Sequence, residues 1–358
     1  MRDPMPAPVR IGVVGCGSIA RAMHLPGIKQ IEALGKARLV AVCDAVQDSA
    51  RTAAERFGVP RALTRQDDLL AMDDVDVVVN LTPIPQHFAV SLAALRAGKH
   101  VYTQKPMTTT VDEATLLIDE ARRVGRLLAC APEHAVRPVI RTMAQLVRDG
   151  AIGTVAFCRV LSSHDGPEKH DVPRDSTWYY QPGSTPILDL GVHGLSQITS
   201  ILGPVRRLSC ASGRSQQQRI TTAGPFKGKR IDVNIDDNSI LLLEFGPATF
   251  GFLDATYCVE ASLSPRLELY GSAGTLAMAA PGCPPLQRYD PASRAWQPVE
   301  VPAGPDVRDL GVLHLVDSLL SGAPLTLTAE HARHLVEVMT AAPRAAAEGR
   351  AIPIHTTF

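Results

Sequence analysis

The sequence predicts two domains of different class: an α/β domain on a Rossmann-type, doubly wound parallel sheet, then an α+β domain on an open-faced, mostly antiparallel sheet with helices. At 358 residues the chain is longer than one hydrophobic core usually serves. Its first 130 residues alternate short, continuously apolar runs with helical patterns, which is typical of a parallel sheet covered on both faces. Later runs are longer and alternate apolar with polar residues, as in a sheet with one exposed face. We expect domains at residues 1–130 and 131–358.

The period of the apolar residues places the elements of both domains. In the first domain we expect strands at 9–14, 37–43, 75–81, 100–103 and 127–130, and helices at 19–34, 47–57, 85–97 and 111–124. In the second we expect strands at 153–161, 205–211, 231–245, 249–257 and 266–270, and helices at 139–148, 186–202, 310–320 and 329–347. Residues 213–230 are polar and contain several glycines, which predicts a mobile loop.

Composition excludes several classes of protein. Lys plus Arg equals Asp plus Glu at 36 each, so no overall field would attract nucleic acid or an anionic membrane. The sequence has no apolar run of 18 residues, and its first eight residues lack the apolar core of a signal peptide. The seven cysteines show neither CxxC nor zinc-like spacing, which indicates reduced thiols. We therefore expect a soluble, cytoplasmic protein without nucleic-acid or membrane partners.

A glycine-rich turn directly follows the first expected strand and opens the first helix. The segment from Gly15 to Ala20 reads G-x-G-x-x-A. Gly15 suits the tight turn, and Gly17 lets a pyrophosphate approach the backbone, while the helix start at Ser18 and Ile19 supplies N–H donors. The alternative is a glycine turn that binds no nucleotide. The strand-to-helix context favours a dinucleotide site.

An acidic residue ends the second expected strand, where a dinucleotide-binding domain holds the adenosine ribose. Asp44 lies further from Gly15 than the usual ~20 residues because the intervening helix is longer. The next residue is Ala45 and not an arginine that could pair with a 2′-phosphate. The sequence therefore predicts NAD as the cofactor in preference to NADP.

Three polar residues are candidates for moving a proton and stabilising charge. Lys105 follows a strand at the edge where open α/β sheets bind ligands. Asp189 and His193 are four residues apart on an expected helix and so share one face. Histidine is the side chain best suited to take a hydroxyl proton near neutral pH. The structural alternatives are a surface lysine and a core histidine. No third ligand for a zinc ion is evident, so no metal is expected.

These motifs resemble the family of glucose-fructose oxidoreductase and inositol 2-dehydrogenase, known as GFO/IDH/MocA. The resemblance extends to residues 79–83 with His87, to 150–153 and to 271–274. It implies that Leu81, Thr82, Pro83, His87, Gln104 and Lys105 contact the cofactor, and that the Lys105–Pro106 bond is cis. It further implies oxidation of a secondary alcohol of a sugar, glycoside or cyclitol, or reduction of the ketone, and assembly of a homodimer or homotetramer through the second sheet.

By the same resemblance, Lys105 holds the reacting oxygen, His193 acts as acid/base, and Asp189 holds substrate hydroxyls or orients the histidine. The sequence departs from the family pattern at Gln104, where the family has Glu, and at 184–185, where it has two glycines. Further candidate substrate contacts are Trp178, Tyr179, Thr185 and His164. Two other functions stay open: an NAD-retaining glycosidase or lyase that works through transient oxidation, and a non-enzymatic NAD- and sugar-sensing regulator.

Overall fold

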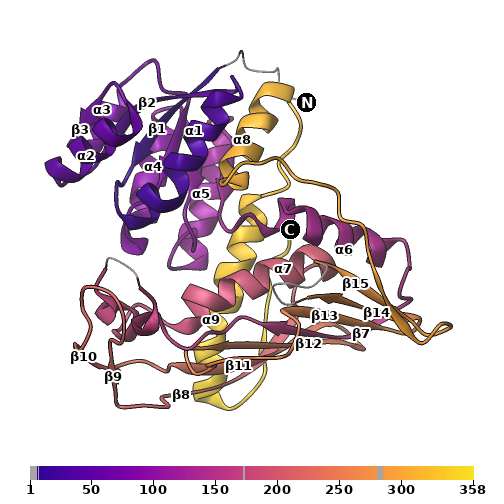
Figure 1. The fold of residues 1–358 in the computed structure, drawn as a ribbon. Helices are drawn as coiled ribbons and strands as arrows, with labels where there is room; N and C mark the ends of the chain where they lie inside the picture. The colour runs from indigo at the N-terminus through magenta and orange to yellow at the C-terminus, as the bar shows by residue number, and fades with distance from the viewer. Residues whose placement is uncertain (1–5, 7, 172–173, 280–284) are drawn as a thin grey trace. The chain divides into compact units, whose positions relative to one another are not determined.

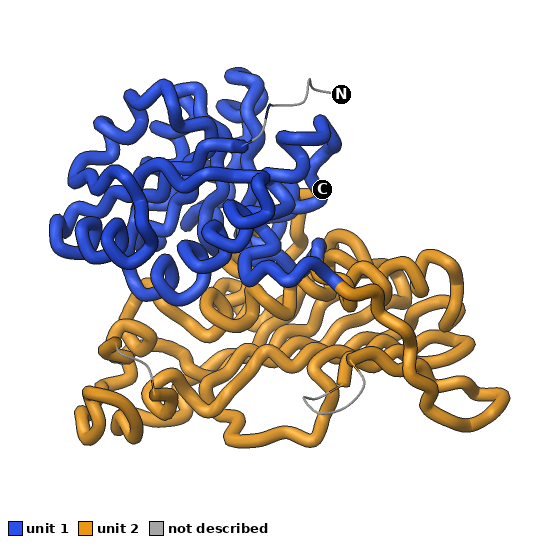
Figure 2. Tube along the Cα trace, turned by 45° about the horizontal axis from the view of Figure 1, so that its top comes forward, with its two compact units in different colours: residues 1–136, 304–336, 358 blue, residues 137–303, 337–357 orange. Residues whose placement is uncertain are grey.

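A computed structural model describes residues 6, 8–171, 174–279 and 285–358 of the chain. They form two compact units (Figure 2). Unit 1 holds residues 1–136, 304–336 and Phe358, and unit 2 holds residues 137–303 and 337–357. Within the described residues, no helix has the length and apolar character needed to cross a membrane.

Unit 1 is built on a six-stranded parallel sheet in the order β3-β2-β1-β4-β5-β6. Its strands are β1 (Val9–Val14), β2 (Ala37–Cys43), β3 (Ala62–Leu63), β4 (Val77–Asn80), β5 (His100–Thr103) and β6 (Leu128–Cys130). The strand order reverses between β1 and β4, so ligands are expected at the carboxyl ends beside these two strands. The predicted doubly wound sheet is confirmed. The two-residue strand β3 was not predicted because it is too short to show a period.

Helices cover both faces of this sheet (Figure 1). The helical segments of unit 1 are the π-helical turn η1 (Ala20–His24), α1 (Leu25–Ala33), α2 (Gln47–Phe57), α3 (Gln66–Leu70), η2 (Ile84–Gln86), α4 (His87–Arg96), α5 (Val111–Arg123), η3 (Glu133–Val136) and α8 (Leu310–Ser321), with part of α9 (Ala329–Glu348). The Thr110 side chain caps α5 by accepting a hydrogen bond from the Glu113 N–H. Left-handed Gly58 ends α2.

The division of the chain differs from the predicted domains 1–130 and 131–358. Helix α8 belongs to unit 1, where Val312 and Leu315 are fully buried in one apolar cluster with Ile11 and Leu39. Gly311 allows this close packing, because a Cβ there would lie 2.2 Å from the Tyr102 hydroxyl oxygen. An apolar helix carries no local signal for which of two sheets it will cover, so its sequence alone did not assign it.

Unit 2 is built on a nine-stranded, mostly antiparallel sheet in the order β16-β15-β14-β13-β7-β12-β11-β8-β17. Its strands are β7 (Val155–Leu161), β8 (Arg207–Gly213), β11 (Asn238–Gly246), β12 (Thr249–Thr256), β13 (Leu267–Gly271), β14 (Gly274–Met278), β15 (Gln287–Asp290), β16 (Ala295–Pro298) and β17 (Ile352–Pro353). Helices α6 (Pro138–Arg148) and α7 (Val192–Leu202) lie over one face of the sheet (Figure 1). The predicted open-faced sheet is confirmed.

The segment 213–230, predicted as a mobile loop, is irregular over most of its length but contains a strand that the sequence did not predict. This strand, β9 (Gln218–Ile220), pairs with β10 (Arg230–Asp232) in a separate hairpin. Arg219 anchors the hairpin: only 4% exposed, it bonds Glu168 at 3.0 Å and Asp237 at 2.8 Å. The polar composition suggested solvent exposure because the buried carboxylates that pair with this arginine lie outside the segment.

Candidate active site

The glycine turn of unit 1 has the geometry that a dinucleotide needs. Gly15 has a φ of 98°, and a Cβ there would lie 2.6 Å from the carbonyl oxygen of Leu81, so only glycine fits. At Gly17 no atom stands within 4 Å of an added Cβ. Packing within the chain therefore does not require this second glycine, whereas close approach of a phosphate to the backbone would. Ser18 and Ile19 follow as exposed residues at the start of the helix, where backbone N–H groups favour an anion.

Asp44 follows β2 with both carboxylate oxygens fixed by the backbone. Its Oδ2 accepts a hydrogen bond of 2.8 Å from the N–H of Cys16, inside the glycine turn. Its Oδ1 accepts one of 2.8 Å from the N–H of Val46. Each oxygen of a carboxylate has two lone pairs, so both can still accept from ribose hydroxyls. This geometry fits the predicted ribose contact.

The turn after β4, Leu81-Thr82-Pro83, is held in place by hydrogen bonds to buried polar side chains. The Asn80 side chain accepts from the Thr82 N–H at 3.2 Å and hydroxyl at 2.6 Å. The ring nitrogens of His87, which is 1% exposed, lie 2.7 Å from the Pro106 carbonyl oxygen and 2.8 Å from that of Thr82. Burial lowers the pKa of His87, against those two backbone contacts. His87 thus links the turn to the segment after Lys105.

Lys105 follows β5 and is half-buried. The predicted cis Lys105–Pro106 bond is confirmed. The backbone N–H of Gln104 donates to the Asn80 carbonyl at 3.0 Å, which continues the β4–β5 pairing by one residue. The residues predicted to contact the cofactor therefore follow the carboxyl ends of β1, β2, β4 and β5, along one edge of one sheet.

In unit 2 the expected helix 186–202 is two elements. A π-helical turn, η6 (Ile187–Gly191), contains Asp189, and α7 begins immediately after it with His193 in its first turn. π-Helical turns are rare and are frequent at functional sites. Gly194 brings α7 close to the sheet, since a Cβ there would lie 2.8 Å from the Val160 side chain. His193 is half-buried.

Tyr257 joins this group, although the sequence did not single it out. Its hydroxyl donates to Asp189 Oδ2 at 3.1 Å, and its ring stacks on His164 with 5.4 Å between centroids. Burial raises the pKa of Tyr257, and the Asp189 carboxylate adds to the effect. Burial also lowers the pKa of His164, helped by His170 and opposed by Asp189. The only sequence signal was an aromatic residue at the end of an alternating strand.

The other candidate substrate contacts lie nearby in the chain. Trp178, 49% exposed, stacks on Tyr179 with 4.9 Å between centroids. Burial and then the Asp189 charge raise the pKa of Tyr179 to about 12. The Thr185 hydroxyl accepts from the Leu188 N–H at 3.3 Å, which caps the following turn. Buried Ser184, where the family has glycine, has a hydroxyl without a hydrogen-bond partner among the described residues.

One cluster in the described part of the chain has metal-like composition. Ligand atoms of His164, Asp165 and His170 lie within 4.8 Å of one another, and two histidines with a carboxylate can bind zinc. However, His164 Nδ1 accepts from the Gly166 N–H at 2.9 Å. His170 Nε2 lies 3.1 Å from Asp165 Oδ1. Contacts within the chain account for this cluster, and we assign no metal to it.

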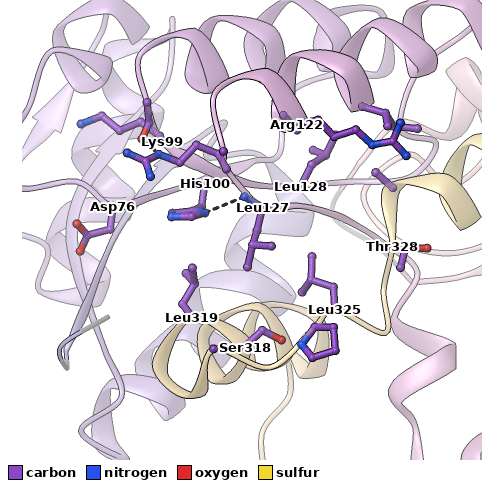
Figure 3. Close-up of a pocket in the computed structure, with 18 of the residues that line it drawn as sticks. Asp76, Lys99, His100, Arg122, Leu127, Leu128, Ser318, Leu319, Leu325 and Thr328 are labelled. Atoms are coloured by element: carbon purple, nitrogen blue, oxygen red, sulfur yellow. Dashed lines mark hydrogen bonds between the residues drawn. The ribbon is translucent and has the colours of Figure 1, made fainter. Parts of the chain in front are cut away.

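A pocket of about 1210 Å³ lies at the opposite edge of the unit 1 sheet (Figure 3). Residues at the amino ends of β4, β5 and β6 line it, together with residues of α5 and the α8–α9 connection; they include Asp76, His100, Leu127 and Leu325. The Leu127 N–H donates to His100 Nδ1 at 2.9 Å across its wall. Because it lies at the amino ends of the strands, this pocket is separate from the candidate cofactor residues.

Comparisons with known proteins identify the family to which the chain is similar. The model of the GFO/IDH/MocA oxidoreductase family with an NAD-binding Rossmann fold matches residues 9–131, and the model of a GFO/IDH/MocA C-terminal domain matches residues 140–277. The dTDP-3,4-didehydro-2,6-dideoxy-alpha-D-glucose 3-reductase of Actinomadura kijaniata is 29% identical over 343 residues, 94% of this chain and 93% of the relative.

Two further relatives differ more in sequence. Myo-inositol 2-dehydrogenase of Thermotoga maritima is 25% identical over 268 residues, 75% of this chain and 74% of the relative. A solved structure of levoglucosan dehydrogenase in complex with NADH shares the fold, with a TM-score of 0.82 at 17% identity, over 97% of this chain and 99% of that one. The two family models together cover more than half of the residues. The chain belongs to the GFO/IDH/MocA family of NAD-binding oxidoreductases.

Proposed function

We propose that this enzyme transfers hydride between NAD and a secondary alcohol, or the matching ketone, of a sugar, glycoside or cyclitol. The observation that carries the proposal is the row of residues along one sheet edge of unit 1, from the glycine turn through Asp44 to Lys105. Unit 2 adds an acid/base candidate, His193, directly after the Asp189 turn. Relatives that act by name on a deoxysugar nucleotide and on myo-inositol support this substrate class.

The chemistry divides between the cofactor and the chain. The glycine turn and Asp44 would hold NAD, which would supply the hydride acceptor for the carbinol carbon. The hydroxyl must lose its proton as the hydride leaves, and an imidazole nitrogen of His193 takes that proton. The Lys105 ammonium donates to the reacting oxygen and stabilises its developing negative charge. In the reducing direction His193 returns the proton to the same oxygen.

The remaining polar and aromatic residues of unit 2 would orient the substrate. Tyr257 fixes the Asp189 carboxylate, which then accepts from substrate hydroxyls or orients His193. The exposed Trp178 ring offers an apolar surface to the C–H face of a sugar, with His164 as a further polar contact.

We also propose that the protein works in a reducing compartment, the cytoplasm, since the six described cysteines are all free thiols.

The proposal is tested with the purified chain, NAD and a panel of inositols, monosaccharides, glycosides and nucleotide sugars. We expect NADH to accumulate in proportion to product with one class of the panel. Glycoside cleavage without accumulating NADH would instead identify an NAD-retaining glycosidase or lyase. Tight binding of NADH and a sugar without turnover of any compound would identify a regulator. Binding measurements with NADH on the same protein reveal whether NAD is exchangeable or tightly held.

We expect the enzyme to bind NADH more tightly than NADPH, because Asp44 would place a carboxylate beside the 2′-phosphate. Asp44→Ala should weaken NADH binding and reduce the preference. Calorimetric titrations of both cofactors measure this. Asp48→Ala, a nearby exposed carboxylate on α2, is the control and should leave the preference unchanged. Tighter binding of NADPH to the wild type would contradict the assignment of Asp44.

We further propose that a second copy of the chain covers the outer face of the unit 2 sheet. The half-exposed side chains of Phe157, Leu242 and Phe250 lie on this face, and Phe157 pairs directly with Phe250. On β13, the other neighbour of β7, Tyr270 stacks on Phe157 with 5.7 Å between ring centroids. An apolar row that crosses four adjacent strands is more extended than scattered surface residues and suits a self-complementary interface.

Light scattering after size-exclusion chromatography should therefore give a dimer or tetramer for the wild type. Leu242→Glu with Phe250→Glu should give monomers, because each subunit would bury two unpaired charges. Leu34→Glu is the matched control, since Leu34 is an exposed apolar residue in unit 1, at 55% against 45% for Leu242. A monomeric wild type, or an unchanged assembly in the double variant, would refute this interface.

A further inference from the structure

We propose that His24 and Asp309 are positioning residues that hold Lys105 in place through the side-chain amide of Gln104. The inference rests on the proposed role of Lys105. It also accounts for glutamine at the position where the family resemblance implies glutamate. All four residues belong to unit 1, and the argument needs only contacts within that unit.

The first link is a buried histidine–carboxylate pair. His24 lies in η1 and Asp309 precedes α8, and both side chains are 0% exposed. His24 Nδ1 lies 2.6 Å from Asp309 Oδ2. The other oxygen of Asp309 accepts from the Val312 N–H at 3.0 Å and caps α8. Gly27 leaves room for this arrangement, because a Cβ there would lie 2.4 Å from the Asp309 Cβ.

The second link joins this pair to the strand end. His24 Nε2 lies 2.6 Å from the amide nitrogen of Gln104. The amide oxygen of Gln104 accepts from the backbone N–H of Lys105 at 3.0 Å. The residues are thus connected in one series from the start of α8 to the backbone of Lys105. Such a series restrains the strand end more tightly than one hydrogen bond would.

Donor and acceptor roles along this series have one consistent assignment. A carboxylate only accepts, and an amide nitrogen only donates. His24 therefore donates from Nδ1 to Asp309 and accepts at Nε2 from Gln104, as the neutral Nδ1–H tautomer. Every polar atom in the series then has a partner, which matters because an unpaired buried group is costly.

A glutamate at position 104 would change this pattern. Its carboxylate could not donate to Nε2, so His24 would have to carry both protons as an imidazolium between two carboxylates. Three buried charges would then replace the single charge of Asp309, while the net charge would stay at −1. In this chain the hydrogen-bonded series therefore contains a single carboxylate, that of Asp309. The residue before Lys105 is then neutral and donates to His24 through its amide nitrogen.

The test is a double-mutant cycle on the full-length protein with NADH bound. We expect Gln104→Glu and Asp309→Asn each to lower kcat about 10-fold or more, with a smaller change in the KM of the substrate. Asparagine is as good an N-cap as aspartate, so Asp309→Asn separates the histidine contact from capping of α8. The double variant should recover to within a few-fold of wild type, because one carboxylate again faces one side of His24.

A second readout does not depend on activity. ¹⁵N NMR of histidine-labelled protein should show His24 as the Nδ1–H tautomer in the wild type and as the Nε2–H tautomer in the double variant, with His24→Gln used for assignment. An Nε2–H tautomer in the wild type, or kcat losses that simply add in the double variant, would overturn the proposal. If no compound in the substrate panel is turned over, the proposed function fails, while the NMR result still decides this inference.

Discussion

Replacing His193 with alanine is expected to lower kcat by roughly 10²–10⁴-fold, the usual contribution of general acid–base catalysis. NAD affinity should stay nearly unchanged, because the proposed cofactor residues all belong to unit 1, whereas His193 belongs to unit 2. Steady-state kinetics with the substrate found in the panel, and calorimetric titration with NADH, measure the two quantities. The physical reason is specific: the hydroxyl proton would have no acceptor as the hydride leaves.

Three comparisons make this result interpretable. His355→Ala removes an exposed histidine of unit 2 and should leave kcat unchanged. Lys105→Ala should lower kcat and also weaken cofactor binding, since it follows the strand end at the cofactor edge. Asp189→Ala should raise KM more than it lowers kcat if the carboxylate mainly holds substrate hydroxyls. A His193→Ala variant with full kcat would make His193 a structural residue, and the fold and family would stand.

The part of the site that the sequence predicted is the part encoded by short-range spacing. The glycine turn and the strand end at Asp44 could be located because each function depends on a few adjacent residues. Strands β1 and β2 were placed at their observed bounds for the same reason, since a buried parallel strand is a continuous apolar run.

The features that the sequence missed depend on contacts between distant segments. His24 and Asp309 are 285 residues apart, so no local pattern could pair them. Tyr257 acquires its role only because the fold brings the end of β12 to η6. Helix α8 is apolar enough for either sheet, and only three-dimensional packing assigns it to unit 1. In each case the residue type was visible, but its partner was not.

Loss of the Arg219 charge should cause the largest loss of stability outside the apolar cores. Its guanidinium bonds Glu168 and Asp237, whose side chains are 2% and 0% exposed, and it lies 5.3 Å from the centre of the Tyr180 ring. Burial alone would lower the pKa of Arg219, but the hydrogen bonds that its guanidinium donates to both carboxylates raise it, so the arginine stays charged. Arg219→Met would leave two carboxylates buried without a counter-ion.

We therefore expect Arg219→Met to reduce the free energy of unfolding by about 3–5 kcal/mol, measured by urea denaturation. Arg207→Met is the matched control: Arg207 pairs with Glu244 at 2.9 Å, but its side chain is 55% exposed, so about 0–1 kcal/mol is expected. Adding Glu168→Gln and Asp237→Asn to Arg219→Met should recover part of the loss, because the uncompensated charges are then gone. Strand β10 and the residues after it bond the segment that carries Trp178, through Asp232 to Gln181 and through Asn234 to Tyr180. A destabilised hairpin should therefore also raise the KM of the substrate. Equal losses of unfolding free energy in the Arg219 and Arg207 variants would show that burial of the Arg219 ion pairs does not matter.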